Sequence, residues 1–171
     1  MIRSTHYRQR VPAVLAVLAV LAPVALAACG GASATASHPT APTATTHPQT
    51  LAQRYTTIVS TGDHQLQKLS TQLNAASGNV VAIQSGFRSV SATYHQVAAQ
   101  VHALPFPAAQ RSDVAAMVSA LSALATDATQ GAQSVTPSEF DLVFTKLAAD
   151  QKTEVAANTT VNHDLGISTI S

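Results

Sequence analysis

Histidine is the residue type in this sequence that most readily changes charge or binds a metal near neutral pH. Four histidines follow the first 50 residues: His64, His95, His102 and His163. In an antiparallel helical fold, His102 and His163 would lie at the same end, where they could share a metal ion or a haem, with Met117 as a further ligand. The alternative is that the histidines are solvated, which is favoured by the position of His102 one step off an apolar stripe.

Two adjacent pairs, Asp63-His64 and His163-Asp164, have the composition of a catalytic dyad. Neighbouring residues on a helix point about 100° apart and do not face each other. We therefore expect each pair to be solvated rather than catalytic.

Motifs of several common enzyme classes are missing from the sequence. A di-iron bundle requires glutamates from four helices, whereas this chain has two glutamates, Glu139 and Glu154, and Glu139 is expected to cap a helix. The sequence contains no His-Glu-x-x-His motif, no P-loop and no Gly-x-Ser-x-Gly elbow. We therefore expect a protein that is not an enzyme and carries no cofactor.

Four polar side chains fall on or near the apolar stripes of the helical segments. Tyr55 and Tyr94 lie on a stripe, so we expect their rings to be buried and their hydroxyls to reach polar partners. Gln151 and Asn158 interrupt the stripe of the last segment. We expect these two side chains to satisfy the tyrosine hydroxyls, and the alternative is that they line a small pocket.

The elements that position these residues follow a targeting segment. Residues 1–10 are polar and carry Arg3, Arg8 and Arg10, and residues 11–28 are apolar and uncharged, an order typical of a secretory signal. A transmembrane helix is the rival interpretation, but the run is short for a membrane span and contains Pro12 and Pro23. We therefore interpret residues 1–28 as a signal peptide.

The apolar run ends in Leu26, Ala27, Ala28 and Cys29. This tetrapeptide resembles the lipobox of bacterial lipoproteins, in which a leucine, two small residues and a cysteine close the signal. The resemblance covers residues 1–29 and implies cleavage before Cys29 and attachment of a diacylglyceryl group, with palmitate as a typical acyl chain, to its thiol. Because two or more acyl chains anchor a protein stably, we expect the chain to be attached to the extracytoplasmic side of the cell membrane. Cys29 is the only cysteine, so no intramolecular disulfide can form.

Residues 29–50 are expected to form a disordered spacer. After Cys29 they contain no charge and no large apolar side chain, and they are rich in Thr, Ala and Pro. Such a segment cannot bury enough apolar surface to offset the entropy of ordering. The composition is similar to that of small helical lipoproteins of high-GC Gram-positive bacteria.

The charge balance excludes one class of partner. Three of the nine Lys and Arg residues lie before residue 29, which leaves six against eight Asp and Glu and a net charge of −2. A nucleic-acid binder needs a basic surface that displaces counterions. We expect no nucleic-acid partner.

From residue 51 onward, apolar residues recur at helical spacing. The pattern predicts four helices over 51–76, 79–104, 107–133 and 137–164, with connections of two to three residues. The predicted stripe of the last segment comprises Phe140, Phe144, Leu147, Ala148 and Val155. Similar lengths and short connections predict an all-α, antiparallel up-down-up-down four-helix bundle over residues 51–171.

Helix boundaries and core ends follow from local chemistry. Thr50 with Gln53, and Thr136 with Glu139, have the spacing of capping boxes. The segment 104–107, Leu-Pro-Phe-Pro, interrupts the helical pattern. We expect Phe106 to cover one end of the core and Phe87, Phe140 and Phe144 to fill the other.

These patterns predict a membrane-anchored extracytoplasmic lipoprotein. We expect the bundle to act as a non-enzymatic binding or scaffolding module of the cell envelope, with an envelope protein or a ligand as its partner. The alternative is a metal- or haem-binding helical-bundle lipoprotein that uses His102 and His163.

Overall fold

The computed structural model describes residues 49–76 and 78–167. Four long helices make up most of this part of the chain: α2 (Leu51–Ala75), α3 (Val80–His102), α4 (Arg111–Gln133) and α5 (Pro137–Asp164). A short 3-10 helix, η2 (Ala108–Gln110), precedes α4. The described residues contain no strand, so the prediction of an all-α fold is confirmed. The predicted signal peptide, the lipobox with Cys29 and nearly all of the predicted spacer lie outside the described residues.

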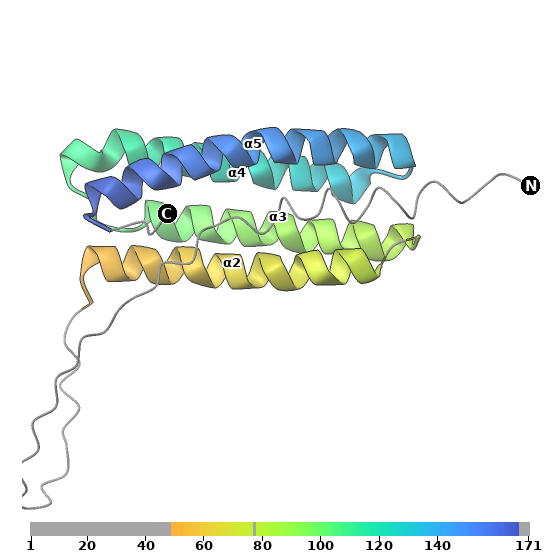
Figure 1. Cartoon of the computed structure of the whole chain (residues 1–171), viewed down its shortest axis with the longest axis horizontal. Coiled ribbons are helices and arrows are strands. Elements are labelled where there is room, and N and C mark those ends of the chain that lie inside the picture. Colours follow the sequence, from red (N-terminus) through yellow and green to blue (C-terminus); the bar gives the residue numbers. More distant parts are fainter. Residues whose placement is uncertain (1–48, 77, 168–171) are drawn as a thin grey trace, which may run out of the picture.

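Successive helices run in opposite directions and form the predicted up-down-up-down bundle (Figure 1). Close approaches of the backbone join α2 to α3, α3 to α4 and α4 to α5, whereas the backbones of α5 and α2 stay further apart. The bundle is therefore least tightly closed where its first helix meets its last. Within the described residues, no helix combines the length and the apolar character that crossing a membrane requires.

Both predicted capping boxes are present. The Thr50 hydroxyl accepts a 3.2 Å hydrogen bond from the Gln53 amide, and the Gln53 side chain accepts a 2.9 Å bond from the Thr50 amide. Thr136 and Glu139 make the same reciprocal pair at the start of α5, where Pro137 is the first helical residue. Local chemistry thus fixes the start of α2 and of α5.

The α3–α4 connection is longer than predicted. It spans residues 103–110 and includes η2, because prolines on both sides of Phe106 exclude a continuous helix. Phe106 is 7% exposed, and its ring meets that of Tyr55 edge-on, with the ring centroids 6.2 Å apart. The connection therefore covers one end of the core with Phe106, as predicted.

An aromatic cluster fills the other end of the core. The Phe87 ring stacks on Phe140 at a centroid distance of 6.0 Å and meets Phe144 at 5.6 Å. Gly131 of α4 lies directly under Phe87, and a Cβ atom added to this glycine would lie 2.7 Å from the ring. The predicted cluster of Phe87, Phe140 and Phe144 is confirmed, and a glycine makes room for it.

Helices α3 and α4 approach each other closely through small residues. Ala125 and Ala128 are fully buried, and the Ser91 hydroxyl of α3 donates a 2.9 Å hydrogen bond to the Ala125 carbonyl of α4. The small side chains of α4 thus let α3 come close along this face.

The buried face of α5 differs from the predicted stripe. Val143 and Glu154 are 3% and 2% exposed, whereas Phe144, Ala148 and Val155 are only half-buried. The observed face continues along one line of the helix through Leu147, past Gln151, to the position of Glu154. The predicted stripe was chosen by hydropathy and therefore included the apolar Val155. In the structure, the packing of the rest of α5 turns Glu154 toward the interior instead, so a carboxyl group is buried.

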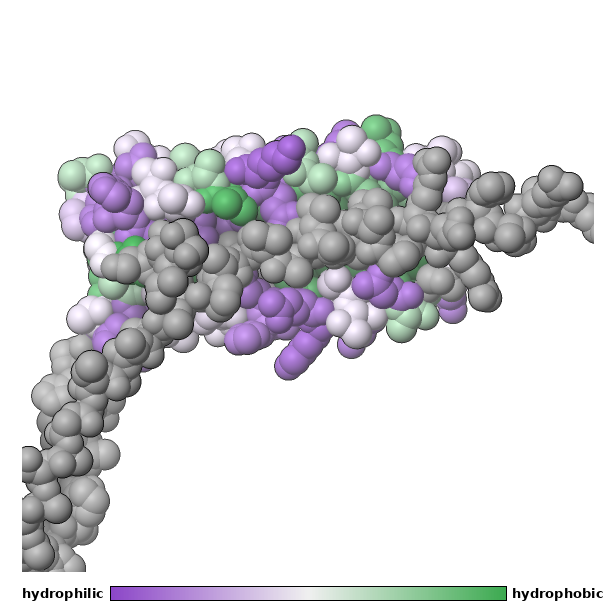
Figure 2. Space-filling view, in the orientation of Figure 1, coloured by the Kyte–Doolittle hydropathy of each residue, from purple (hydrophilic) through white to green (hydrophobic). Residues whose placement is uncertain are grey.

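The outer surface of the bundle is mostly polar. Hydrophilic and weakly polar side chains cover most of the described surface that is visible in Figure 2. Exposed large apolar side chains are Val80, Val81, Val135 and Leu142. They belong to the start of α3, the α4–α5 turn and the first turns of α5, and so to one end of the bundle (Figure 1).

Candidate functional site

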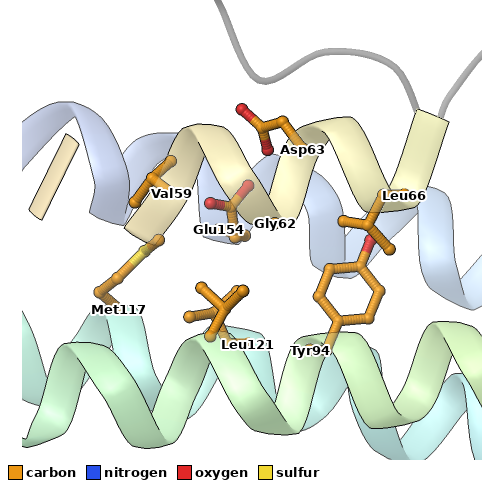
Figure 3. A pocket seen from close by; sticks show the side chains of 9 residues that line it. Val59, Gly62, Asp63, Leu66, Tyr94, Met117, Leu121 and Glu154 are labelled. Atoms are coloured by element: carbon orange, nitrogen blue, oxygen red, sulfur yellow. The ribbon is translucent and has the colours of Figure 1, made fainter. Parts of the chain in front are cut away.

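A small cavity lies in the middle of the bundle, between α2 and α5. Its volume is about 10 Å³, which is room for roughly one water molecule. Each of the four helices contributes to its wall, and Figure 3 shows α2 and α5 above a floor of α3 and α4 side chains. The lining residues are Val59, Gly62, Asp63, Leu66, Tyr94, Val97, Met117, Leu121 and Glu154.

Two carboxyl groups from opposite sides meet at this cavity. Glu154 of α5 is 2% exposed, and its Oε1 atom is buried without a hydrogen-bond partner in the described structure. Asp63 of α2 is half-buried, and its Oδ1 atom also lacks a described partner. In Figure 3 the two side chains lie near each other across the gap between α2 and α5. The site therefore holds two buried acceptors for which the described part of the chain provides no donor.

Burial changes the acidity of both carboxyl groups. It raises the pKa of Asp63 to about 7. Burial, together with the charge on Asp63, raises the pKa of Glu154 to about 8. No cationic side chain of the described residues offsets these shifts. Near neutral pH both carboxyl groups are therefore partly protonated. Above pH 8 both are ionised, and the pair then consists of two like charges in a buried position.

Two buried tyrosines lie close enough to the carboxyl pair to be affected by its charge. Tyr55 is 1% exposed and donates a 2.6 Å hydrogen bond from its hydroxyl to Asn158 Oδ1. Tyr94 is 3% exposed and lines the cavity. Burial, and then the charges of Glu154 and Asp63, raise the pKa of both tyrosines, which stay neutral phenols. The expectation that Asn158 satisfies a tyrosine hydroxyl is confirmed for Tyr55.

Gly62 sets the position of Asp63. A Cβ atom added to Gly62 would lie 2.5 Å from Val97 Cγ2, so the glycine lets α2 approach α3 closely at this level. The next residue, Asp63, is thereby held at the edge of the cavity instead of projecting fully into solvent. The expectation that Asp63 is simply solvated is wrong, because the adjacent close approach draws its carboxyl group toward the interior.

The histidines considered as possible metal ligands lie at the surface. His64, His95, His102 and His163 are all exposed. His102 and His163 end α3 and α5, and Met117 is buried at the cavity, 1% exposed. In the described part of the chain, no group of three or more His, Cys, Asp or Glu side chains lies close enough to hold a metal ion.

The second adjacent pair, His163-Asp164, lies at the surface. His163 Nδ1 and Asp164 Oδ1 are 3.8 Å apart, and the His163 side chain is 90% exposed. This arrangement agrees with the expectation of a solvated pair. A surface contact of this kind contributes little to stability.

Sequence reasoning missed a further pair of acids between α4 and α5. Asp127 is 6% exposed, and its Oδ2 atom has no hydrogen-bond partner in the described structure. Burial, and then the charge of Asp150, raise the pKa of Asp127, while Lys146 lowers it. Unlike the cavity pair, this pair has a cation close by.

The sequence positions of Asp63 and Glu154 weakly indicated their burial, which their hydropathy does not show. Glu154 follows Leu147 by seven residues and therefore lies on the same helix face. Asp63 follows a glycine that falls on the α2 stripe.

No protein-family model matches this chain, and neither the curated proteins nor the solved structures include one with significant similarity to it.

Proposed function

We propose that this chain is an extracytoplasmic lipoprotein whose helical bundle acts as a non-enzymatic binding module of the cell envelope. Two parts of the proposal have separate support. The anchor is supported by the order of a basic start, an uncharged apolar run and Leu26-Ala27-Ala28-Cys29. The binding role is supported by the cavity between α2 and α5.

The observation that carries the binding role is the unpartnered Oε1 atom of Glu154 in that cavity. A buried acceptor without a donor destabilises a fold by about 1–3 kcal/mol. Strained or unsatisfied groups of this kind are concentrated at functional sites. The cost is offset when a ligand supplies the missing donor.

The size of the cavity favours binding over catalysis. At about 10 Å³ it accommodates a group no larger than a water molecule beside the two carboxyls. An enzyme needs room for a substrate in a reactive position next to its acid and base. The cavity is therefore better suited to enclose one small group than to hold a substrate in a reactive position.

Fractionation of cells that express Cys29→Ser tests the anchor. We expect the wild-type chain in the detergent phase of a detergent-partition assay and the Cys29→Ser chain in the aqueous phase, because the variant lacks the sulfur that the acyl chains modify. Ser33→Ala is the matched control, since it changes a small residue nearby and leaves the thiol in place. Retention of Cys29→Ser in the detergent phase would contradict the lipid anchor.

A further inference from the structure

The boundary between α2 and α5 is where the bundle can open with the least loss of packing. The backbones of successive helices approach closely, whereas those of α2 and α5 stay further apart. A hydrogen bond from the Tyr55 hydroxyl to Asn158 Oδ1 crosses this boundary, and Asp63 lies near Glu154 across it (Figure 3). We call this boundary, defined by these four residues, the α2–α5 seam. Separation along the seam leaves the packing of α3 on α4 and of α4 on α5 in place.

The closed seam gives an ionised Glu154 no solvation. Glu154 is 2% exposed, and its Oε1 atom is buried without a hydrogen-bond partner in the described structure. The adjacent cavity of about 10 Å³ has an almost entirely apolar wall. A carboxylate in such a place loses its hydration and gains no donor in exchange. The charge is solvated only when α2 and α5 move apart and water reaches the carboxyl oxygens.

The groups that face Glu154 add repulsion without attraction. Asp63 faces it from α2, Tyr94 lines the same cavity from α3, and the α4 side chains in the cavity wall are apolar. Tyr55 of α2 and Tyr94 stay neutral because the two acids and burial raise the pKa of both phenols. No cationic side chain of the described residues offsets the raised pKa values of Asp63 and Glu154, about 7 and about 8. Since each helix carries one acid, their repulsion acts across the seam.

We propose that the α2–α5 seam is a pH-sensitive switch, which is closed while Asp63 and Glu154 carry at most one negative charge between them and opens when both are ionised. On opening, α2 moves away from α5, while α3, α4 and α5 keep their mutual packing. The open form binds fewer protons, so its population relative to the closed form rises with pH, by up to about tenfold per pH unit for each proton released.

Opening brings both carboxyl groups and the apolar side chains beneath them into contact with solvent, and so controls access to the cavity. This consequence rests on the proposed binding function, whereas the opening itself needs neither a ligand nor the lipid anchor. A seam that stays closed would remove the switch and leave the proposed function to its own tests.

Distances between spin labels test the switch. The full-length chain is studied in detergent micelles with Cys29→Ser, which removes the native thiol. Labels on Ser60→Cys and Ala156→Cys report the separation of α2 and α5, and labels on Ala99→Cys and Ala116→Cys report that of α3 and α4; all four native residues are exposed. We expect one distance for each pair at pH 5.5. At pH 8.5 we expect an additional, longer distance for the α2–α5 pair alone.

Substitution of the acids links the opening to its cause. Glu154→Gln removes the buried charge, so the α2–α5 pair should keep the short distance at both pH values, and Asp63→Asn should weaken the pH dependence. Asp141→Asn, at an exposed position of α5, is the matched control and should open as the wild type does. Circular dichroism shows whether each variant keeps its helices.

Three results would overturn the proposal. The first is an unchanged α2–α5 distance in the wild type between pH 5.5 and pH 8.5. The second is an opening of Glu154→Gln equal to that of the wild type. The third is a longer distance for the α3–α4 pair as well, since that would show a general loosening of the bundle instead of an opening at the seam.

Discussion

The Tyr55 hydroxyl donates a 2.6 Å hydrogen bond to Asn158 Oδ1 and so ties α2 to α5, whose backbones approach each other less closely than those of successive helices do. Asn162 approaches the same oxygen at 3.4 Å. The bond lies in the same gap between α2 and α5 as the carboxyl pair, about one helical turn from Glu154 along α5.

Replacing Tyr55 with Phe removes this bond and keeps the ring that packs on Phe106. We expect the free energy of unfolding to fall by about 1 kcal/mol, because a part-buried acceptor loses the closer of its two donors. Denaturant unfolding measures the change. In a double-mutant cycle with Asn158→Ala, the second substitution should cost less in the Tyr55→Phe background. Full additivity of the two costs would show that the bond contributes nothing.

The carboxyl pair makes stability depend on pH. The pKa values of Asp63 and Glu154 are raised in the fold to about 7 and about 8, so the folded chain binds more protons than the unfolded chain between about pH 4 and pH 8. The stabilisation is fully present below the unfolded pKa values and is lost as pH rises through the folded ones. We expect the free energy of unfolding to fall between pH 5 and pH 8, by up to about 1.4 kcal/mol per pH unit for each proton.

Glu154→Gln tests the origin of this dependence. The variant should show a shallower decrease of stability with pH, and at pH 8 it should be more stable than the wild type by about 1–3 kcal/mol, since it removes a buried charge that has no partner. Asp141→Asn, on the exposed side of α5, should keep the wild-type slope. An unchanged slope in Glu154→Gln would refute the assignment to this group.

The close approach of α2 and α3 depends on Gly62. Gly62→Ala places a Cβ atom against Val97, whose branched side chain has little freedom to move. We expect a loss of about 1–2 kcal/mol in unfolding free energy, since overpacking exceeds the gain in helix propensity. Ser60→Ala, at an exposed position of α2, measures the effect of an alanine without a clash. Adding Val97→Ala should recover part of the loss, and a simple sum of the two losses would contradict the predicted clash.

The aromatic end of the core depends most on Phe87. This residue is fully buried between Phe140 and Phe144 and fills the space above Gly131. We expect Phe87→Ala to cost about 3–5 kcal/mol, measured by chemical unfolding. Phe144→Ala, at a half-buried position, should cost clearly less. Equal losses would indicate that Phe87 and Phe144 contribute equally to the stability of the fold.

Helical spacing predicted most of the fold. The starts of α2 and α5 agree with the capping boxes at Thr50 and Thr136, because a cap depends on residues three positions apart in the sequence. The predicted α3–α4 connection was too short. The prolines indicate a break in the helix, but they do not specify that Phe106 packs back over the core, because that packing is a tertiary contact.

The candidate site was less accessible to sequence reasoning. Glu154 and Asp127 read as surface residues by their charge, and only the packing of whole helices buries them. The bond between Tyr55 and Asn158 could be expected, since the Tyr55 hydroxyl needs a polar partner in the core and Asn158 interrupts an otherwise apolar face. The pairing of Asp63 with Glu154 joins residues far apart in the chain, and their approach depends on how the first and last helices meet.

An even number of antiparallel helices returns the chain to its starting side. The beginning of α2 and the end of α5 therefore lie at the same pole of the bundle (Figure 1). A circularly permuted chain, with a short glycine linker from Ile167 back to Gln49 and new ends opened at Gly78, should keep the same core. With the proposed lipid anchor before α2, the α2–α3 and α4–α5 turns at the opposite pole would be the part of the domain that first meets an approaching partner.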